Sequence, residues 1–552
     1  MQVPVNLARF SLILAMILSY AAPVRAEEAT ASAPLFSGMG NYHFSVATEN
    51  SLARRYFDQG MVLSFAFNHA EAARSFQEAV RLDPQCALCY WGWALVLGPN
   101  INAGMEDSAV AEAWQAVVKA SNLAGSVTLK EQTLIRALEK RYAPEPATDR
   151  TALDEAYADA MRAAALEFPK DADVLALLAE ALMDLHPWDL WTRQKEAKPW
   201  TPEILQVLLA ALKHNPDHPL ANHLYIHAVE ASRHPEKGIP AADRLRDLVP
   251  GAGHLVHMPA HIYINVGRYR DAAIANQKAI EADQNYLRQV KAQGIYPLGY
   301  VPHNYHFLWA AAMMAGQSVL AIEAARGTAA SVDQTMLRES KFGPTLQHFF
   351  TMPLYALARF GKWDEILQEP APPQDLHYTT GIWHFVRGMA FNAQGNSSEA
   401  ERELDQLRSI AGDPAVDREA VWDLNKFSTL FKIAIAVLQG EIAAKQGDHD
   451  QAVDHLQQAV QIEDGLNYTE PADWYFPPRQ ALGAVLLEAG RPAAAEKVYR
   501  EDLEENPHNG WSLFGLAKSL KSQGNTEAAR KVEEQFQKAW NKADIQLTRS
   551  RF

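Results

Sequence analysis

The sequence predicts an all-α protein built as an array of packed helix pairs. The first observation behind this fold class is a pattern of small and large apolar residues in residues 51–84 that matches two antiparallel helices. The second is that the same pattern returns, in the same frame, along the rest of the chain. The third is the composition: 552 residues, 48% hydrophobic and 21% charged, are typical of a globular protein and sufficient for an extended core.

The segment 51–84 shows the pattern most clearly. With Ala53 as position 1, small residues fall where two helices must approach closely, large apolar residues fill the seam between them, and a proline stops the second helix. These residues are Gly60 and Ala72 at positions 8 and 20, Tyr56, Leu63 and Phe76 at positions 4, 11 and 24, and Pro84 at position 32.

The frame recurs in the segment that begins at Gly253 and in those that place Gly440 and Gly483 at position 8. This pattern resembles the tetratricopeptide repeat, and the resemblance covers nearly all of the chain after residue 26. It implies a right-handed α-solenoid of roughly eleven helix pairs, in which each repeat touches only its neighbours. The stretches "CALCYWGWALVLGPN" and "NGWSLFGLAKSL" are also similar to stretches in large exported bacterial members of this superfamily.

The first 26 residues are predicted to be a secretory signal peptide. An early arginine precedes the apolar run "SLILAMILSYAA", and Val24 and Ala26 stand at the spacing that signal peptidase recognises. The run is shorter than the ~20 residues that span a bilayer, although an uncleaved anchor is the alternative. We therefore expect a periplasmic or secreted protein with no membrane span after cleavage.

The remaining chain divides into an N-terminal superhelix, 27–368, with an insertion and a histidine-lined groove, and a C-terminal array, 369–552. The insertion occupies residues 98–150 and predicts one or two extra helices and a loop. Residues 186–202 hold three tryptophans between prolines and predict a long aromatic loop, while "EPAPPQD" at 369–375 is a candidate hinge. Ordinary surface elaborations explain these three segments equally well.

Charge and cysteine content exclude several classes of protein. The formal net charge is −15, and loss of Arg9 and Arg25 with the signal peptide makes it −17, which argues against a nucleic-acid or anionic-membrane partner. Cys86 and Cys89 are the only cysteines. Tyr90 follows them where a histidine would mark haem attachment, so a local disulfide and two packed thiols remain the alternatives.

Histidines reuse the same positions of successive repeats. In this superfamily, positions 2, 5, 9 and 12 of the first helix line the concave face, and spacings of three and four keep side chains on one side of a helix. Residues 214–306 contain 10 of the 19 histidines, and the residues in this register are His223, His227 and Glu230, then His254, His257 and His261, then His303 and His306. His348 stands at position 2 of a further repeat.

These eight residues, His223 to His306 with Glu230, are our candidate metal ligands. Neutral imidazole is the commonest protein metal ligand, and two histidines four residues apart on a helix form a recurrent ligand pair. Glu230 is either a ligand or an orienting partner of an imidazole. Nitrogen ligands with one carboxylate suit copper, zinc or iron, and export favours copper or zinc. A metal-free groove for an anionic peptide, a pH sensor and purely structural histidines are the alternatives.

Other motifs give little more. The stretch "YTEPADWYFPPRQ", 468–480, either caps the groove or seals a repeat junction. A glycine-rich phosphate loop, a G-x-S-x-G elbow and an HExxH motif are absent from the sequence. Two functions follow: a metalloprotein, with open coordination that would permit oxygen or hydrolytic chemistry, or a non-enzymatic scaffold that binds peptides or envelope proteins.

Overall fold

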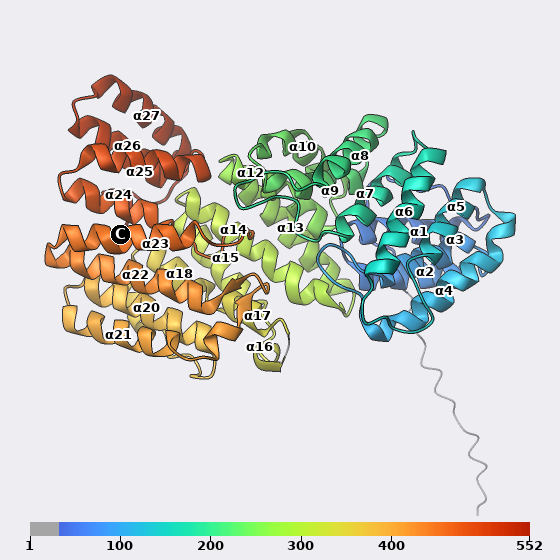
Figure 1. The fold of residues 1–552 in the computed structure, drawn as a ribbon, viewed down its shortest axis with the longest axis horizontal. Helices are drawn as coiled ribbons and strands as arrows, with labels where there is room; N and C mark the ends of the chain where they lie inside the picture. Colours follow the sequence, from blue (N-terminus) through green and yellow to red (C-terminus); the bar gives the residue numbers. More distant parts are fainter. Residues whose placement is uncertain (1–32, 340) are drawn as a thin grey trace, which may run out of the picture. The chain divides into compact units, whose positions relative to one another are not determined.

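The computed structural model describes residues 33–339 and 341–552, and these form one compact unit. The predicted signal peptide lies outside the described residues. Helices account for nearly all regular structure, which confirms the all-α class, and each helix packs against its neighbours in sequence (Figure 1). The division predicted between residues 368 and 369 stays a prediction.

The first part of the array contains the predicted insertion, whose two helices are α4 and α5. Its elements are α1 (Ser51–Phe65), α2 (His69–Leu82), α3 (Ala87–Leu97), η1 (Asp107–Ala109), α4 (Val110–Leu123), η2 (Ala124–Ser126), α5 (Leu129–Glu139), α6 (Thr151–Glu167) and α7 (Ala172–Asp184).

The middle part follows the tryptophan-containing loop, which is not helical. Its elements are α8 (Thr201–His214), α9 (Pro219–Glu230), η3 (Pro235–Gly238), α10 (Ile239–Leu248), α11 (Gly253–His257), α12 (Pro259–Asn265), α13 (Tyr269–Gln289), η4 (Tyr296–Tyr300), α14 (Val301–Met314) and α15 (Ser318–Ala330).

The last part contains the only two strands among the described residues, a short antiparallel pair. Its elements are α16 (Met336–Glu339), α17 (Gly343–Phe350), α18 (Met352–Arg359), α19 (Trp363–Gln368), α20 (His377–Ala393), α21 (Ser397–Ala411), η5 (Val416–Arg418), β1 (Ala420–Val421), β2 (Asn425–Lys426), α22 (Phe427–Gln446), α23 (His449–Glu463), α24 (Pro478–Glu488), α25 (Pro492–Glu505), α26 (Gly510–Ser522) and α27 (Thr526–Ala539).

Close helix packing depends on the small residues that the repeat pattern identified. A Cβ atom added to Gly60 of α1 would lie 2.7 Å from the ring of Phe76 on α2. The same relation returns between Gly483 of α24 and Tyr499 of α25, where the distance would be 2.4 Å. Each glycine therefore admits a large ring from the paired helix, as the repeat pattern predicts.

Prolines shape the helices of the middle part. The segment that begins at Gly253 was expected to start with one helix, but it is divided at Met258 into α11 and α12 because Pro259 has no N–H to donate. Met258 keeps right-handed helical dihedral angles, so α12 continues from α11. Histidines on both pieces can therefore still face the same side.

The described N-terminal segment is fixed to helices far from it in sequence. Tyr42 donates a hydrogen bond of 2.7 Å to Asp173 at the start of α7. The same carboxylate contacts Lys130 at 2.8 Å and His218 at 3.2 Å. Burial raises the pKa of Asp173, but the His218 hydrogen bond and the Lys130 charge outweigh burial and hold it well below its usual value.

Two structural details bear on the predictions about membrane and redox state. Cys86 and Cys89 form a disulfide at the start of α3, which decides between the disulfide and the two packed thiols.

Helix α22 is long and apolar enough to cross a membrane, contrary to our expectation that no segment after the signal peptide would be long and apolar enough. However, 72% of its apolar window is buried, and the helix packs on α20, α21 and α23 as a core helix does.

Candidate metal centre

Six of the predicted histidines form one continuous cluster inside the array. Helix α9 supplies two of them, α11 two, and α12 and α14 one each; these helices are packed through contacts of α12 with α9 and α13, and of α13 with α11 and α14 (Figure 1). Neighbouring ring centroids are 4.7–6.5 Å apart. The residues are His223, His227, His254, His257, His261 and His303, of which only His303 is not fully buried.

The ring nitrogens fall into two triads, each with one nitrogen per ring within 4.8 Å of the others. Triad A comprises His223, His227 and His254, and triad B comprises His257, His261 and His303. A third possible grouping joins the triads through His227, Glu230 and His261.

In triad A, outer acceptors determine which nitrogen carries the proton. His223 Nδ1 donates to the carbonyl oxygen of Phe65 at 2.7 Å, and His227 Nδ1 donates to Glu230 Oε1 at 2.8 Å. Because Nδ1 is the donor, Nε2 of both rings is a free lone pair, and both Nε2 atoms are buried without a partner. Neither ring nitrogen of His254 has a partner. Each buried polar atom without a hydrogen-bond partner destabilises the folded state by about 1–3 kcal/mol.

Triad B is arranged in the same way. His257 Nδ1 donates to Asn276 Oδ1 at 2.7 Å, and the Asn276 amide nitrogen donates to Ala272, which fixes the amide orientation. His261 Nδ1 donates to Glu230 Oε2 at 2.6 Å and also contacts Glu470. The acceptors again leave Nε2 of both rings as the free nitrogen. This arrangement, in which an outer acceptor holds Nδ1 and presents Nε2, is typical of metal-binding histidines.

The two free nitrogens of triad B face each other at close range. His257 Nε2 and His261 Nε2 are 2.7 Å apart, so two bare lone pairs would repel unless a cation lies between them. A proton is one such cation. Burial opposes protonation of His261, but the carboxylates of Glu470 and Glu230 outweigh burial and raise its pKa to about 10. Burial lowers the pKa of His257 far below its usual value, so that ring remains neutral and accepts.

A metal ion is the other possible cation. Two nitrogens bound at about 2.0–2.1 Å to one tetrahedral ion stand about 3.3 Å apart, so the rings would need to separate by roughly 0.6 Å. Burial also lowers the pKa of His227 to about 3 and keeps His254 and His303 neutral, the state in which imidazole binds metal. The donor set therefore fits copper, zinc or iron.

Aromatic rings enclose the cluster. The ring centroid of Phe67 is 4.6 Å from that of His223, and that of Phe307 is 4.6 Å from His261. Phe67 has a φ of 55°, a left-handed conformation that is strained for a side chain of this kind. The strained turn after α1 therefore places both the Phe65 carbonyl and the Phe67 ring against triad A.

The cluster opens onto a large groove. A cavity of about 1320 Å³ has His227, Glu230, Phe307 and Glu470 in its wall, and the tryptophan-containing loop contributes Trp188. Trp188 is 48% exposed, and its ring centroid lies 5.3 Å from that of His227. Molecules in the groove can therefore reach His227 of triad A, and the Glu230 and Glu470 carboxylates that contact His261 of triad B.

His306 belongs to neither triad, although its ring centroid is 6.4 Å from that of His303. Its Nε2 contacts the hydroxyl of Tyr475, and the same hydroxyl hydrogen bonds His348 Nε2 at 2.6 Å. His348 Nδ1 hydrogen bonds Tyr378 at 3.0 Å. Although His306 shares the repeat register of the other candidate ligands, it does not occur in any of the three candidate metal groups among the described residues.

Three supporting residues come from positions that the sequence did not assign to the site. Glu470 and Tyr475 both belong to the stretch 468–480, so this stretch does contact the groove. Burial and repulsion from Glu230 raise the pKa of Glu470. Asn276 on α13 was missed because its role depends only on how α13 packs behind α11.

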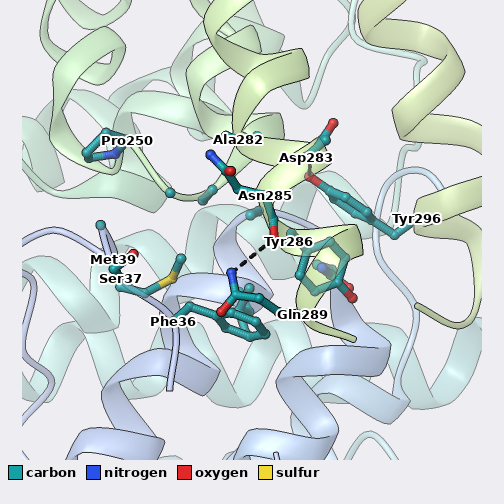
Figure 2. Close-up of a pocket in the computed structure, with 17 residues that line it drawn as sticks. Phe36, Ser37, Met39, Pro250, Ala282, Asp283, Asn285, Tyr286, Gln289 and Tyr296 are labelled. Atoms are coloured by element: carbon teal, nitrogen blue, oxygen red, sulfur yellow. Dashed lines mark hydrogen bonds between the residues drawn. The ribbon is translucent and has the colours of Figure 1, made fainter. Parts of the chain in front are cut away.

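A smaller cavity of about 360 Å³ has Gly253, at the start of α11, in its wall (Figure 2). Figure 2 shows Asp283 and Tyr296 on one side of it and Phe36 and Met39 on the other. Tyr296 donates to Asp283 at 2.8 Å and accepts from the backbone N–H of His254 at 3.1 Å. This network therefore holds the start of α11, and burial raises the pKa of Asp283 to about 7.

Comparisons with known proteins agree with the repeat architecture. Three segments, 53–86, 434–458 and 486–535, match family models described as tetratricopeptide repeats. These matches confirm the tetratricopeptide-repeat pattern that the sequence predicted, near both ends of the array. No curated protein matches it.

Solved structures offer distant likenesses. The human IFIT1 dimer with m7Gppp-AAAA is 14% identical, with 90% of this chain and 91% of that chain covered at a TM-score of 0.30. The APC/C hetero-tetramer Cut9–Hcn1 is also 14% identical, with 89% and 76% covered at a TM-score of 0.29. Likenesses this distant carry no argument about what this chain binds.

Proposed function

We propose that the protein is an exported metalloprotein whose histidine cluster binds a transition metal ion, with copper or zinc favoured and iron as a further candidate. The observation that carries the proposal is the 2.7 Å contact between His257 Nε2 and His261 Nε2, whose Nδ1 atoms are both engaged elsewhere. A cation is needed at that point, and the surrounding nitrogens are those that a metal ion prefers.

A proton on His261 explains that contact but not the rest of the cluster. The Nε2 atoms of His223 and His227 and both nitrogens of His254 are buried without a partner and aimed among other imidazoles. A single proton on His261 cannot satisfy these atoms. Metal binding accounts for the 2.7 Å contact and gives a partner to one free nitrogen of each of these rings, because it uses the lone pairs of neutral imidazoles.

Export is the second component of the proposal. It is supported by the signal-peptide pattern of residues 1–26 and by the Cys86–Cys89 disulfide, since disulfides persist in oxidising compartments. Expression of the full chain in a bacterial host followed by N-terminal sequencing of the periplasmic protein tests it. We expect the mature chain to begin at Glu27; an intact Met1 on cytosolic protein would contradict it.

Metal analysis tests the metal site. Protein purified without a polyhistidine tag is stripped, reconstituted with zinc or copper, desalted and analysed by inductively coupled plasma mass spectrometry. We expect stoichiometric metal in the wild type, a clear loss in His257→Ala and no change in His234→Ala, a matched control at an exposed position. Less than about a tenth of an equivalent of any transition metal after reconstitution would end the proposal.

The groove favours a second candidate function, a scaffold for a peptide or an envelope protein. Its volume of about 1320 Å³ and its wall of Trp188, Trp191 and Tyr468 suit an extended chain. Under this function, a specific partner captured by the protein survives both chelation and the His257→Ala substitution. Loss of the partner on either treatment would instead tie the groove to the metal.

A further inference from the structure

We infer that the centre is dinuclear, with one ion bound by triad A and a second by triad B. This inference rests on the proposed metal-binding function and specifies it further. Its ligand class is a pair of divalent first-row cations, zinc or copper, each held by three imidazole nitrogens.

Each triad has its own unsatisfied nitrogens. In triad A these are His223 Nε2, His227 Nε2 and both nitrogens of His254. In triad B the nitrogen without a partner is His303 Nδ1, while the facing Nε2 atoms of His257 and His261 contact only each other, at 2.7 Å. One ion in either triad leaves the other triad with free, buried nitrogens, so a single site does not account for the cluster.

Each triad also has one outer acceptor of its own, and the two triads share another. The Phe65 carbonyl serves triad A, and the Asn276 amide oxygen serves triad B. Glu230 serves both, because Oε1 accepts from His227 and Oε2 accepts from His261. One carboxylate thus orients one ligand of each ion, an arrangement that a mononuclear site would not need.

The triads are adjacent but use different rings. The centroids of His227 and His261 are 5.4 Å apart, and those of His254 and His257 are 5.7 Å apart. Because no ring belongs to both triads, both can be filled at once. The carboxylates of Glu230 and Glu470 lie beside this junction and can offset part of the charge of two cations.

Separate aromatic walls accompany the two triads. Phe67 contacts His223 and His254, with centroid distances of 4.6 and 5.5 Å. Phe307 contacts His257, with a centroid distance of 4.7 Å. Each triad therefore has its own imidazoles, one outer acceptor of its own and its own apolar cover, and the two share Glu230.

The third grouping, His227, Glu230 and His261, describes the competing arrangement of one ion between the triads. The Nδ1 atoms of both histidines in this grouping already donate to Glu230. An ion there would leave His223, His254, His257 and His303 without metal. The stoichiometry separates the two arrangements.

The test is a titration of the intact apoprotein with Zn²⁺ in competition with a chromophoric chelator, repeated with Co²⁺ and read from its visible spectrum. We expect two equivalents in the wild type, one in His254→Ala, one in His303→Ala and two in the exposed control His234→Ala. Circular dichroism and the thermal midpoint check that each variant is folded. If a variant does not fold, the wild-type stoichiometry alone distinguishes a dinuclear from a mononuclear centre.

The possible outcomes separate the two proposals. Two equivalents in the wild type support the dinuclear centre. One equivalent overturns it while leaving the proposed metal-binding function intact, and none overturns both. A wild type loaded with two Cu²⁺ ions gives a second readout: we expect a half-field signal from two interacting ions in electron paramagnetic resonance, and an isolated-ion spectrum would contradict the pair.

Discussion

Glu230 provides the sharpest mutational test of how the cluster is held, because one buried carboxylate accepts from His227 and His261 at 2.8 and 2.6 Å. The Glu230→Gln substitution keeps the size of the side chain but leaves only one oxygen. Its amide NH₂ then faces the Nδ1 atom of the other ring. That ring must either lose its partner or move its proton to Nε2, where the proton blocks the metal.

The size of the effect follows from these two contacts. A hydrogen bond to a buried charged group contributes about 1.5–3 kcal/mol, and one of the two is lost. Substitution of an outer partner of a metal-binding histidine typically weakens metal affinity by about 10–100-fold, which corresponds to roughly 1.4–2.7 kcal/mol. The two estimates agree, so we expect the metal dissociation constant to rise by about 10–100-fold.

The assay is competition with a chelator of known affinity, for the wild type, Glu230→Gln and Glu236→Gln. Glu236 is a matched control because it lies in the next turn along the chain, η3, and is 55% exposed. We expect the control to bind like the wild type. A folded Glu230→Gln protein whose affinity changes by less than about threefold would refute the role of Glu230 as the shared orienting partner.

Three further predictions concern other parts of the account. A Cβ atom on Gly253 would lie 2.0 Å from Asp283 Oδ1, so Gly253→Ala should destabilise the fold by about 1–3 kcal/mol and lower the midpoint of a calorimetric scan by roughly 1–3 °C; an unchanged midpoint would contradict the packing behind α11. His306→Ala should leave the metal stoichiometry unchanged, because that ring contacts a tyrosine outside both triads; loss of an equivalent in mass spectrometry would return it to the ligand set. The hydrogen bond with His218 helps to keep the pKa of Asp173 low. The ionised carboxylate therefore stabilises the folded state at pH values above about 4, the ordinary carboxyl pKa, and this stabilisation is lost as the pH falls below that value. The thermal midpoint of Asp173→Asn should therefore lie roughly 1–3 °C below the wild type at pH 7, and the gap should narrow at pH 3; a gap independent of pH would contradict the ionic origin.

The positions of six histidines could be predicted because they depend on local geometry. Spacings of three and four residues keep side chains on one face, and the repeat frame brings those faces together on successive helices. The division at Pro259 does not change which side the histidines face, because α12 continues from α11. His306 shares the register, but its Nε2 contacts Tyr475, which belongs to the loop before α24.

The outer partners could not be predicted in the same way, because they come from distant parts of the chain. The Phe65 carbonyl reaches His223 across 158 residues and is a backbone atom, so no side-chain pattern reveals it. Glu470 reaches His261 from the loop before α24, and Asn276 depends on the packing of α13. Of the outer acceptors, only Glu230 was marked by its own spacing, three residues after His227.

Anomalous diffraction from reconstituted crystals tests the central claim most directly. Data collected on both sides of the zinc or copper absorption edge should show a peak about 2.0–2.1 Å from Nε2 of His257 and His261, with those two atoms moved apart from their 2.7 Å contact. A reconstituted crystal with no such peak and the 2.7 Å contact intact would contradict it, and would assign that contact to a shared proton.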